Sequence, residues 1–91
     1  MNKQRRKSID ELISRISSLK SEVEDLQSEI GSVLEEEQEY RDNMHENLSG
    51  GDKAQAADEA ISQLEDAVSE MENVDGSLDQ ITESLETAKG E

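Results

Sequence analysis

Apolar residues recur at alternating steps of three and four along residues 8–45, which is the spacing of a coiled-coil seam. Position a of this heptad holds Ile9, Ile16, Val23 and Ile30, and position d holds Leu12, Leu19, Leu26 and Val33. The register continues through Glu37, Tyr40 and Met44, while Ile13 and Leu34 at position e widen the stripe. The pattern predicts a long helix over 8–45, with Ser8 and Glu11 in the form of a capping box at its start.

A second helical stretch is predicted over 53–88. Its apolar positions are Ala57, Ile61, Leu64, Val68 and Met71, followed by Val74, Leu78, Ile81, Leu85 and Ala88. The two runs join through consecutive three-residue steps at Met71 and Val74, which is a stammer-like phase slip. Gly76 lies at this join and disfavours a helix by about 1 kcal/mol relative to alanine. We therefore expect local overwinding or a break near residues 74–77.

The segment between these stretches, residues 46–52, contains Gly50 and Gly51 and predicts a turn, with Asp52 as the N-cap of the second helix. Two stretches of similar length joined by a short turn indicate an all-α fold, an antiparallel two-helix coiled-coil hairpin. Residues 1–7 would form a basic N-terminal tail that either extends the helix or frays, and residues 89–91 would form a C-terminal tail.

A parallel dimer of the first helix is the competing arrangement, because β-branched residues at a and leucine at d favour two parallel strands. Its flanking pairs are unattractive, since Arg15 would face Lys20 and Glu29 would face Leu34. We therefore favour the hairpin. Pairing of two hairpins would cover Ile13 and Leu34, which we take as the apolar association residues.

Composition supports a thin molecule and also suits a chain that folds only on binding. Hydrophobic residues make up 31% of the 91 residues, Tyr40 is the only aromatic residue, and proline and cysteine are absent. A two-helix seam needs less apolar volume than a globular core. The basic N-terminus is not followed by the apolar stretch of a secretory signal, and no apolar run is long enough to span a bilayer. The expected location is the cytoplasm, or the host cytoplasm if the chain is phage-encoded.

The net charge is −15, and residues 8–91 carry five cations against 24 acids. Such a body repels nucleic acids and anionic membranes and attracts basic protein surfaces. Carboxylates recur every seven residues in the second helix, at Asp58, Glu65, Glu72, Asp79 and Glu86. A second acidic row on the first helix comprises Glu22, Glu29 and Glu36. The rows are either a solvated outer face or a surface that binds a partner.

The sequence lacks a group of residues that would support catalysis, a metal site or a cofactor site. His45 has only neighbouring loop carboxylates, and Ser49–Lys53 lacks the spacing of a phosphate-binding loop. A calcium loop centred on Gly76 would place Met71 and Thr82 where carboxylates are needed. We therefore predict a protein that is not an enzyme and needs no metal or cofactor.

Four segments together carry a resemblance to a known group. They are Asn2-Lys3-x-Arg5-Arg6-Lys7, Glu35-Glu36-Glu37-x-Glu39, Asn43-Met44-x-Glu46-Asn47-Leu48 and Ala60-Ile61-x-x-Leu64-Glu65-Asp66-Ala67-Val68. With these segments the chain resembles small, uncharacterised acidic coiled-coil hairpin proteins of bacteria and their phages. The resemblance implies a hairpin, a phage or mobile-element origin, and no catalytic activity.

Two functional hypotheses follow. The first is a non-enzymatic protein-binding coiled coil of structural or adaptor type, which binds another helix or forms a homodimer. The alternative is a phage-type acidic inhibitor whose carboxylate rows mimic nucleic acid and block a DNA- or RNA-binding host protein, in the anti-restriction or anti-CRISPR class. Neither hypothesis includes direct binding to nucleic acid or to a membrane.

Overall fold

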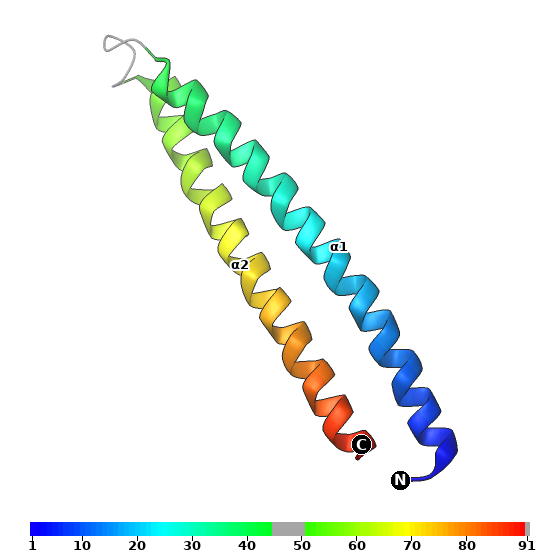
Figure 1. Ribbon diagram of the computed structural model, residues 1–91. Coiled ribbons are helices and arrows are strands. Elements are labelled where there is room, and N and C mark those ends of the chain that lie inside the picture. The colour runs from blue at the N-terminus through cyan, green and yellow to red at the C-terminus, as the bar shows by residue number, and fades with distance from the viewer. Residues whose placement is uncertain (45–50, 91) are drawn as a thin grey trace.

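A computed structural model describes residues 1–44 and 51–90, which form two long helices packed side by side in opposite directions (Figure 1). Helix α1 spans Lys3–Asp42 and helix α2 spans Asp52–Lys89, with both chain ends at the same end of the molecule. The molecule measures 70 × 15 × 15 Å, and its radius of gyration is 20.3 Å. A compact domain of this length would have a radius of about 12 Å. The predicted all-α helical hairpin is confirmed.

Helix α1 begins five residues before the predicted start at Ser8, so most of the expected basic tail is helical. Its N-cap is Asn2, whose side-chain oxygen accepts a hydrogen bond from the backbone N–H of Arg5 at 2.8 Å. This cap supplies the helix start that we had assigned to Ser8. At the other end α1 stops at Asp42 rather than at residue 45, and Asn43 donates its backbone N–H to the carbonyl of Glu39 at 3.0 Å.

Helix α2 begins at Asp52, which is its first helical residue and not the predicted N-cap. Gly51 is the N-cap and has no side chain to bond the helix end, while the Asp52 carboxylate lies where the helix dipole favours negative charge. The helix ends at Lys89, and its C-cap, Gly90, adopts a left-handed conformation with a φ of 79°. Most of the predicted turn over 46–52, and His45 before it, lies outside the described residues.

Helix α2 is continuous through Gly76, so the break that we expected as one outcome near residues 74–77 does not occur. The buried and partly buried positions instead continue in steps of four and three from Met71 through Asp75, Leu78, Thr82 and Leu85. Val74 and Ile81 lie outside this line and are 43% and 47% exposed. The apparent phase slip arose because apolar Val74 was read as a seam residue, whereas polar Asp75 occupies that position.

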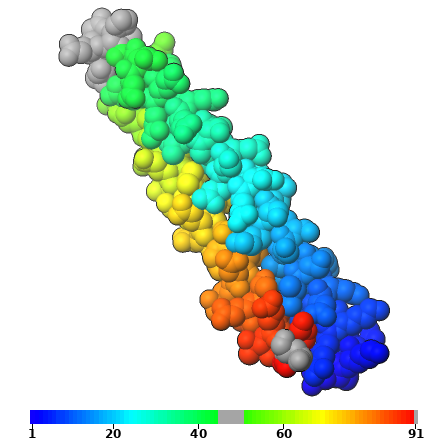
Figure 2. All heavy atoms as spheres, viewed as in Figure 1, coloured from blue at the N-terminus to red at the C-terminus, as the bar shows by residue number. Residues whose placement is uncertain are grey.

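The seam of α1 also differs from the predicted one. Its buried and partly buried residues include positions a and e, namely Ile9, Ile13, Ile16, Lys20, Val23, Gln27, Ile30, Leu34, Arg41 and Met44. The predicted d positions are exposed, which corrects the a/d assignment. Among the described residues, the buried apolar ones are Val23, Ala54, Ala57 and Leu78, of which Val23 and Leu78 remain 7% and 8% exposed. The space-filling view shows two thin helices in contact along their length (Figure 2), so the hairpin has a narrow core.

Candidate functional site

The seam separates two long flanks of different character. One flank lies beside the partly buried e positions of α1. It includes the residues one helical turn further along, such as Glu24 four residues after Lys20, because 3.6 residues complete a turn. The α2 residues that contact those e positions lie on the same flank. We call this side the acidic flank, because it carries the row Asp58, Glu65, Glu72, Asp79 and Glu86.

Lys20 is the centre of the polar contacts between the helices. Its Nζ lies 2.8 Å from Asp75 Oδ2, 3.0 Å from Asp79 Oδ1 and 3.4 Å from Glu24 Oε2. Hydrogen bonds to Asp75 and then to Asp79 hold the pKa of Lys20 well above the usual value for lysine. The other oxygen of Asp75, Oδ1, is buried and has no hydrogen-bond partner among the described residues. Lys20 and Asp75 thus form a polar layer within the apolar seam.

Further polar contacts tie the acidic flank to the opposite helix. Arg41 Nε lies 2.8 Å from Asp58 Oδ1, and Gln27 Nε2 donates to Glu72 Oε1 at 3.3 Å. At the open end Lys89 Nζ lies 2.8 Å from Asp10 Oδ1. Three carboxylates of the α2 row, those of Asp58, Glu72 and Asp79, therefore contact α1.

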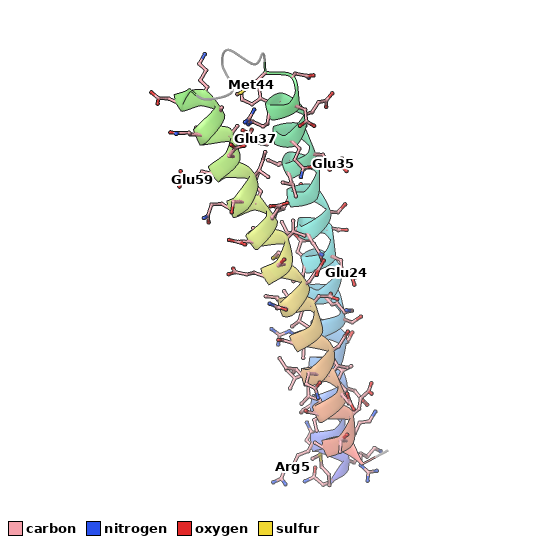
Figure 3. The ribbon with its side chains drawn as sticks, turned by 90° about the vertical axis from the view of Figure 1, so that its left-hand side faces the viewer. Arg5, Glu24, Glu35, Glu37, Met44 and Glu59 are labelled. Atoms are coloured by element: carbon pink, nitrogen blue, oxygen red, sulfur yellow. The ribbon has the colours of Figure 1, made fainter. Side chains whose placement is uncertain are left out.

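The remaining acids of the predicted rows are exposed. Glu65 and Glu86 lie on the acidic flank, and Glu22, Glu29 and Glu36 lie on the outer surface of α1. Figure 3 shows the same outward direction for Glu35 and Glu59, whereas Glu37 lies between the helices. The predicted acidic rows are thus on different faces, and part of one row holds the hairpin together.

The opposite side, which we call the apolar flank, carries the α1 residues at position d, which were predicted to lie in the seam. Its α1 row is Leu12, Leu19, Leu26, Val33 and Tyr40, which are 43%, 51%, 42%, 51% and 50% exposed. The α2 row on the same side is Ala60, Ala67, Val74, Ile81 and Ala88. Both rows precede a seam residue by one position, and in an antiparallel pair such positions share one side of the seam. The hairpin is therefore amphipathic across its width.

A hollow of about 350 Å³ lies on the apolar flank and is lined by Leu12, Arg15, Ile16 and Leu19. These four residues have the spacing i, i+3, i+4 and i+7, which encloses one diamond on a helix surface. In coiled coils such a diamond is the hole that receives one side chain of a facing helix. The hollow therefore has the form of a site that receives one side chain from another helix.

Ile13 and Leu34, the predicted association residues, are partly buried in the seam between α1 and α2. The more exposed apolar residues are Leu19 and Val33, which sequence analysis had placed in the seam. The sequence contained a signal that positions a and e, and not a and d, face α2. Lys20 at position e is level with Asp75 and Asp79 when the chain is folded as a hairpin. Opposite charges at matching heights indicate which faces of the two helices meet.

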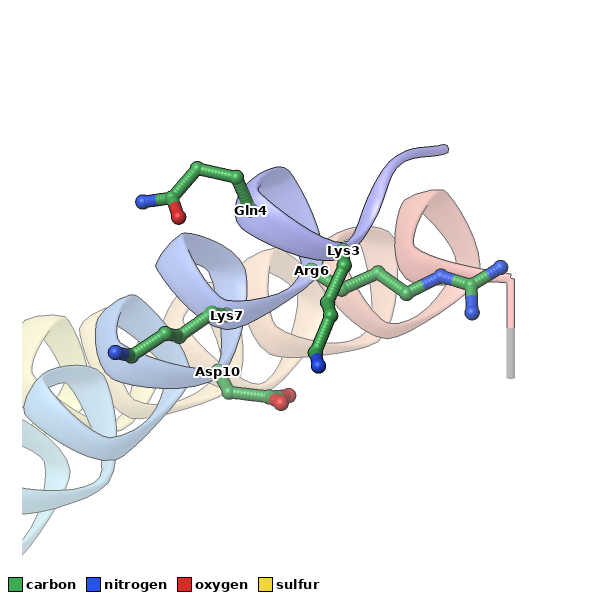
Figure 4. A pocket seen from close by; sticks show the side chains of 5 residues that line it. All are labelled: Lys3, Gln4, Arg6, Lys7 and Asp10. Atoms are coloured by element: carbon green, nitrogen blue, oxygen red, sulfur yellow. The ribbon is translucent and has the colours of Figure 1, made fainter.

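A second hollow, of about 620 Å³, lies on the basic first turns of α1 and is lined by Lys3, Gln4, Arg6, Lys7 and Asp10. Figure 4 shows the nitrogen ends of Lys3, Arg6 and Lys7 pointing in different directions. Asp10 also places a carboxylate in the same hollow, and this carboxylate contacts Lys89. This arrangement does not focus positive charge on one ligand.

Within residues 1–44 and 51–90, three or more histidine, cysteine, aspartate or glutamate side chains do not gather in a way that could hold a metal ion. Neither described helix combines the length and apolar character that crossing a bilayer requires. Comparison of the chain with protein-family models, curated proteins and solved structures finds no match. The apolar flank is therefore the strongest candidate site on physical grounds.

Proposed function

We propose that this protein is a non-enzymatic, structural or adaptor coiled-coil protein that binds a helical protein surface through its apolar flank. The observation that carries the proposal is the row of half-exposed large apolar side chains along α1, at Leu12, Leu19, Leu26, Val33 and Tyr40. Isolated apolar residues are common on protein surfaces, but a row that recurs every seven residues along α1 marks an interaction site.

The shape of the flank favours a helix as the bound element. The hollow bounded by Leu12 and Leu19 has the helix-packing spacing described above, and the row repeats every seven residues. A globular ligand would need a concave pocket, whereas a helix needs a straight row of holes. The flank therefore suits another helix better than a small molecule.

The alternative function, mimicry of nucleic acid by carboxylate rows, has weaker support. Asp58 and Asp79 lie 2.8 and 3.0 Å from cations of α1, so part of their charge is neutralised within the hairpin. The exposed acids are divided between the acidic flank and the outer face of α1 and do not form one surface. A protein groove that binds nucleic acid contacts a continuous run of phosphate charge, and the divided acids of this hairpin do not reproduce such a run.

Capture from cell lysate at 0.05 and 0.5 M salt tests the proposal with three forms of the protein. The variant Leu19→Ser with Leu26→Ser removes two exposed apolar side chains, and Glu65→Gln with Glu86→Gln removes two exposed acids. We expect salt-resistant capture of a helical protein, or of the protein itself, which the leucine variant loses and the acid variant keeps. Capture that both salt and the acid variant abolish would overturn the proposal in favour of mimicry.

A further inference from the structure

We propose that the apolar flank binds a second copy of this chain, giving a four-helix bundle in which α1 of each copy packs on α2 of the other. The two copies run in the same direction, related by a two-fold axis along the length of the hairpin. This inference rests on the proposed function, because it names the partner of the same surface.

The exposed apolar area is large enough for a stable dimer. Seven large apolar residues on this flank, five on α1 with Val74 and Ile81 on α2, are between 42% and 51% exposed. At roughly 150–200 Å² for the full surface of such a residue, they leave about 500–650 Å² of exposed surface per copy. Two copies would bury at most about 1,300 Å² from these residues, which lies at the low end of the range of specific interfaces.

The two rows of the flank differ in size in a way that fits a second copy. The α1 row consists of leucine, valine and tyrosine, whereas Ala60, Ala67 and Ala88 make three of the five positions of the α2 row. Packing α1 on the partner's α2 places the large α1 row against a row that is mostly alanine, while Leu19 meets the larger Val74 and Ile81. Packing α1 on the partner's α1 would crowd the leucines and leave alanine facing alanine.

The heights of the side chains also agree with this arrangement. In the hairpin Lys20 contacts Asp75 and Asp79, so Leu19 lies level with the stretch between Val74 and Ile81. A two-fold axis along the hairpin preserves these heights between copies, and Leu19 therefore meets the same stretch of the partner. Each helix then has two antiparallel neighbours, as in up-and-down bundles.

The charges bordering the flank are compatible with a second copy. The border on α1 is acidic, with Glu22, Glu29 and Glu36 after Arg15, whereas the border on α2 is Ala56, Gln63, Glu70, Ser77 and Ser84. The α1 border thus carries three acids and one cation, and the α2 border carries one acid. With α1 on the partner's α2, acidic residues lie beside neutral ones, and Glu29 with Glu70 is the one like-charged pair along these two rows.

Oligomeric state is the first test, measured by sedimentation equilibrium of the full chain from 1 to 100 µM. We expect a dimer that Leu19→Ser with Leu26→Ser weakens at least about 100-fold. Both leucines are half exposed in the hairpin, so the variant should keep its helical circular dichroism. The matched control, Gln55→Ser with Gln80→Ser, alters exposed residues away from the flank and should stay dimeric. A wild-type monomer at 100 µM would overturn the inference.

The direction of the two copies is tested independently by a spin label on a single cysteine replacing Gln55. The chain contains no other cysteine, and Gln55 lies in the first turn of α2, which begins at the end of the hairpin away from the chain termini (Figure 1). Copies running in the same direction place two labels across the bundle width, below about 40 Å apart. Copies running in opposite directions place them above about 50 Å apart, since each hairpin is 70 Å long, and that result would overturn the arrangement.

Failure of this inference can be distinguished from failure of the proposed function. Suppose that the wild type is a monomer and captures another helical protein at high salt, and that the Leu19→Ser, Leu26→Ser variant loses this capture. That result would reject the second copy and support the proposed function. If the wild type is a monomer and the leucine variant captures the same proteins as the wild type, both the second copy and the proposed function would be rejected.

Discussion

Replacing Gly76 with alanine tests whether α2 is an uninterrupted helix. Gly76 is exposed in the interior of the helix, and a Cβ atom added there meets no atom within 4 Å. Alanine removes the entropic cost of glycine without a clash, so the free energy of unfolding should rise by about 1 kcal/mol. For a domain of this size, that gain corresponds to a midpoint of thermal unfolding about 4–8 °C higher.

The same substitution at Gly90 is the matched control, because it should have the opposite sign. Gly90 has a φ of 79°, a left-handed conformation that costs an alanine about 1 kcal/mol or more. Thermal unfolding followed by circular dichroism at one fixed protein concentration measures both variants, since self-association makes the midpoint depend on concentration. If Gly76→Ala left the midpoint unchanged or lowered it, the continuous helix through residues 74–77 would be refuted.

Three further predictions concern the polar contacts. Lys20→Met should lower the urea midpoint of unfolding, because it leaves the partly buried Asp75 without its cation. The double variant Lys20→Leu with Asp75→Leu should be more stable than either single leucine variant. The raised pKa of Lys20 means that its stabilising contribution is fully present below the ordinary lysine pKa and is lost as pH rises through the higher folded pKa. The difference in urea midpoint between wild type and Lys20→Met should therefore stay constant from pH 7 to about 10 and shrink above it, and a constant difference at pH 12 would contradict the assignment. Asn2→Ala should cost up to about 1 kcal/mol and speed amide exchange in the first turn, where Asn2 accepts from Arg5, and unchanged exchange there would argue against the cap.

The sequence predicted the two helices and their antiparallel arrangement because the apolar spacing, the Gly50–Gly51 pair and the similar helix lengths agree. It did not predict which face of α1 meets α2. Ile9 and Ile16 belong to two overlapping stripes, one with Leu12 and Leu19 and the other with Ile13 and Lys20. Hydrophobicity alone favoured the first stripe, because lysine seldom occupies a seam.

Pairing between the helices decides the question, and it depends on residues far apart in the sequence. Lys20 is 55 residues from Asp75, and their contact compensates two polar residues at seam positions. Val74, one residue earlier, then turns outward to the apolar flank. The helix start was missed for a local reason, since Asn2 and Ser8 both have capping side chains and only the backbone conformation distinguishes them.

Because both ends of the chain lie at the same end of a 70 Å hairpin, the molecule has a distinct mechanical response. Tension applied between the ends loads the seam in an unzipping geometry, in which contacts break one after another and do not share the force. The contact between Lys89 and Asp10 would break first, and the cluster around Lys20 would be the next polar barrier along the seam. Pulled from these ends, the hairpin would yield at a lower force than the same seam sheared along its axis.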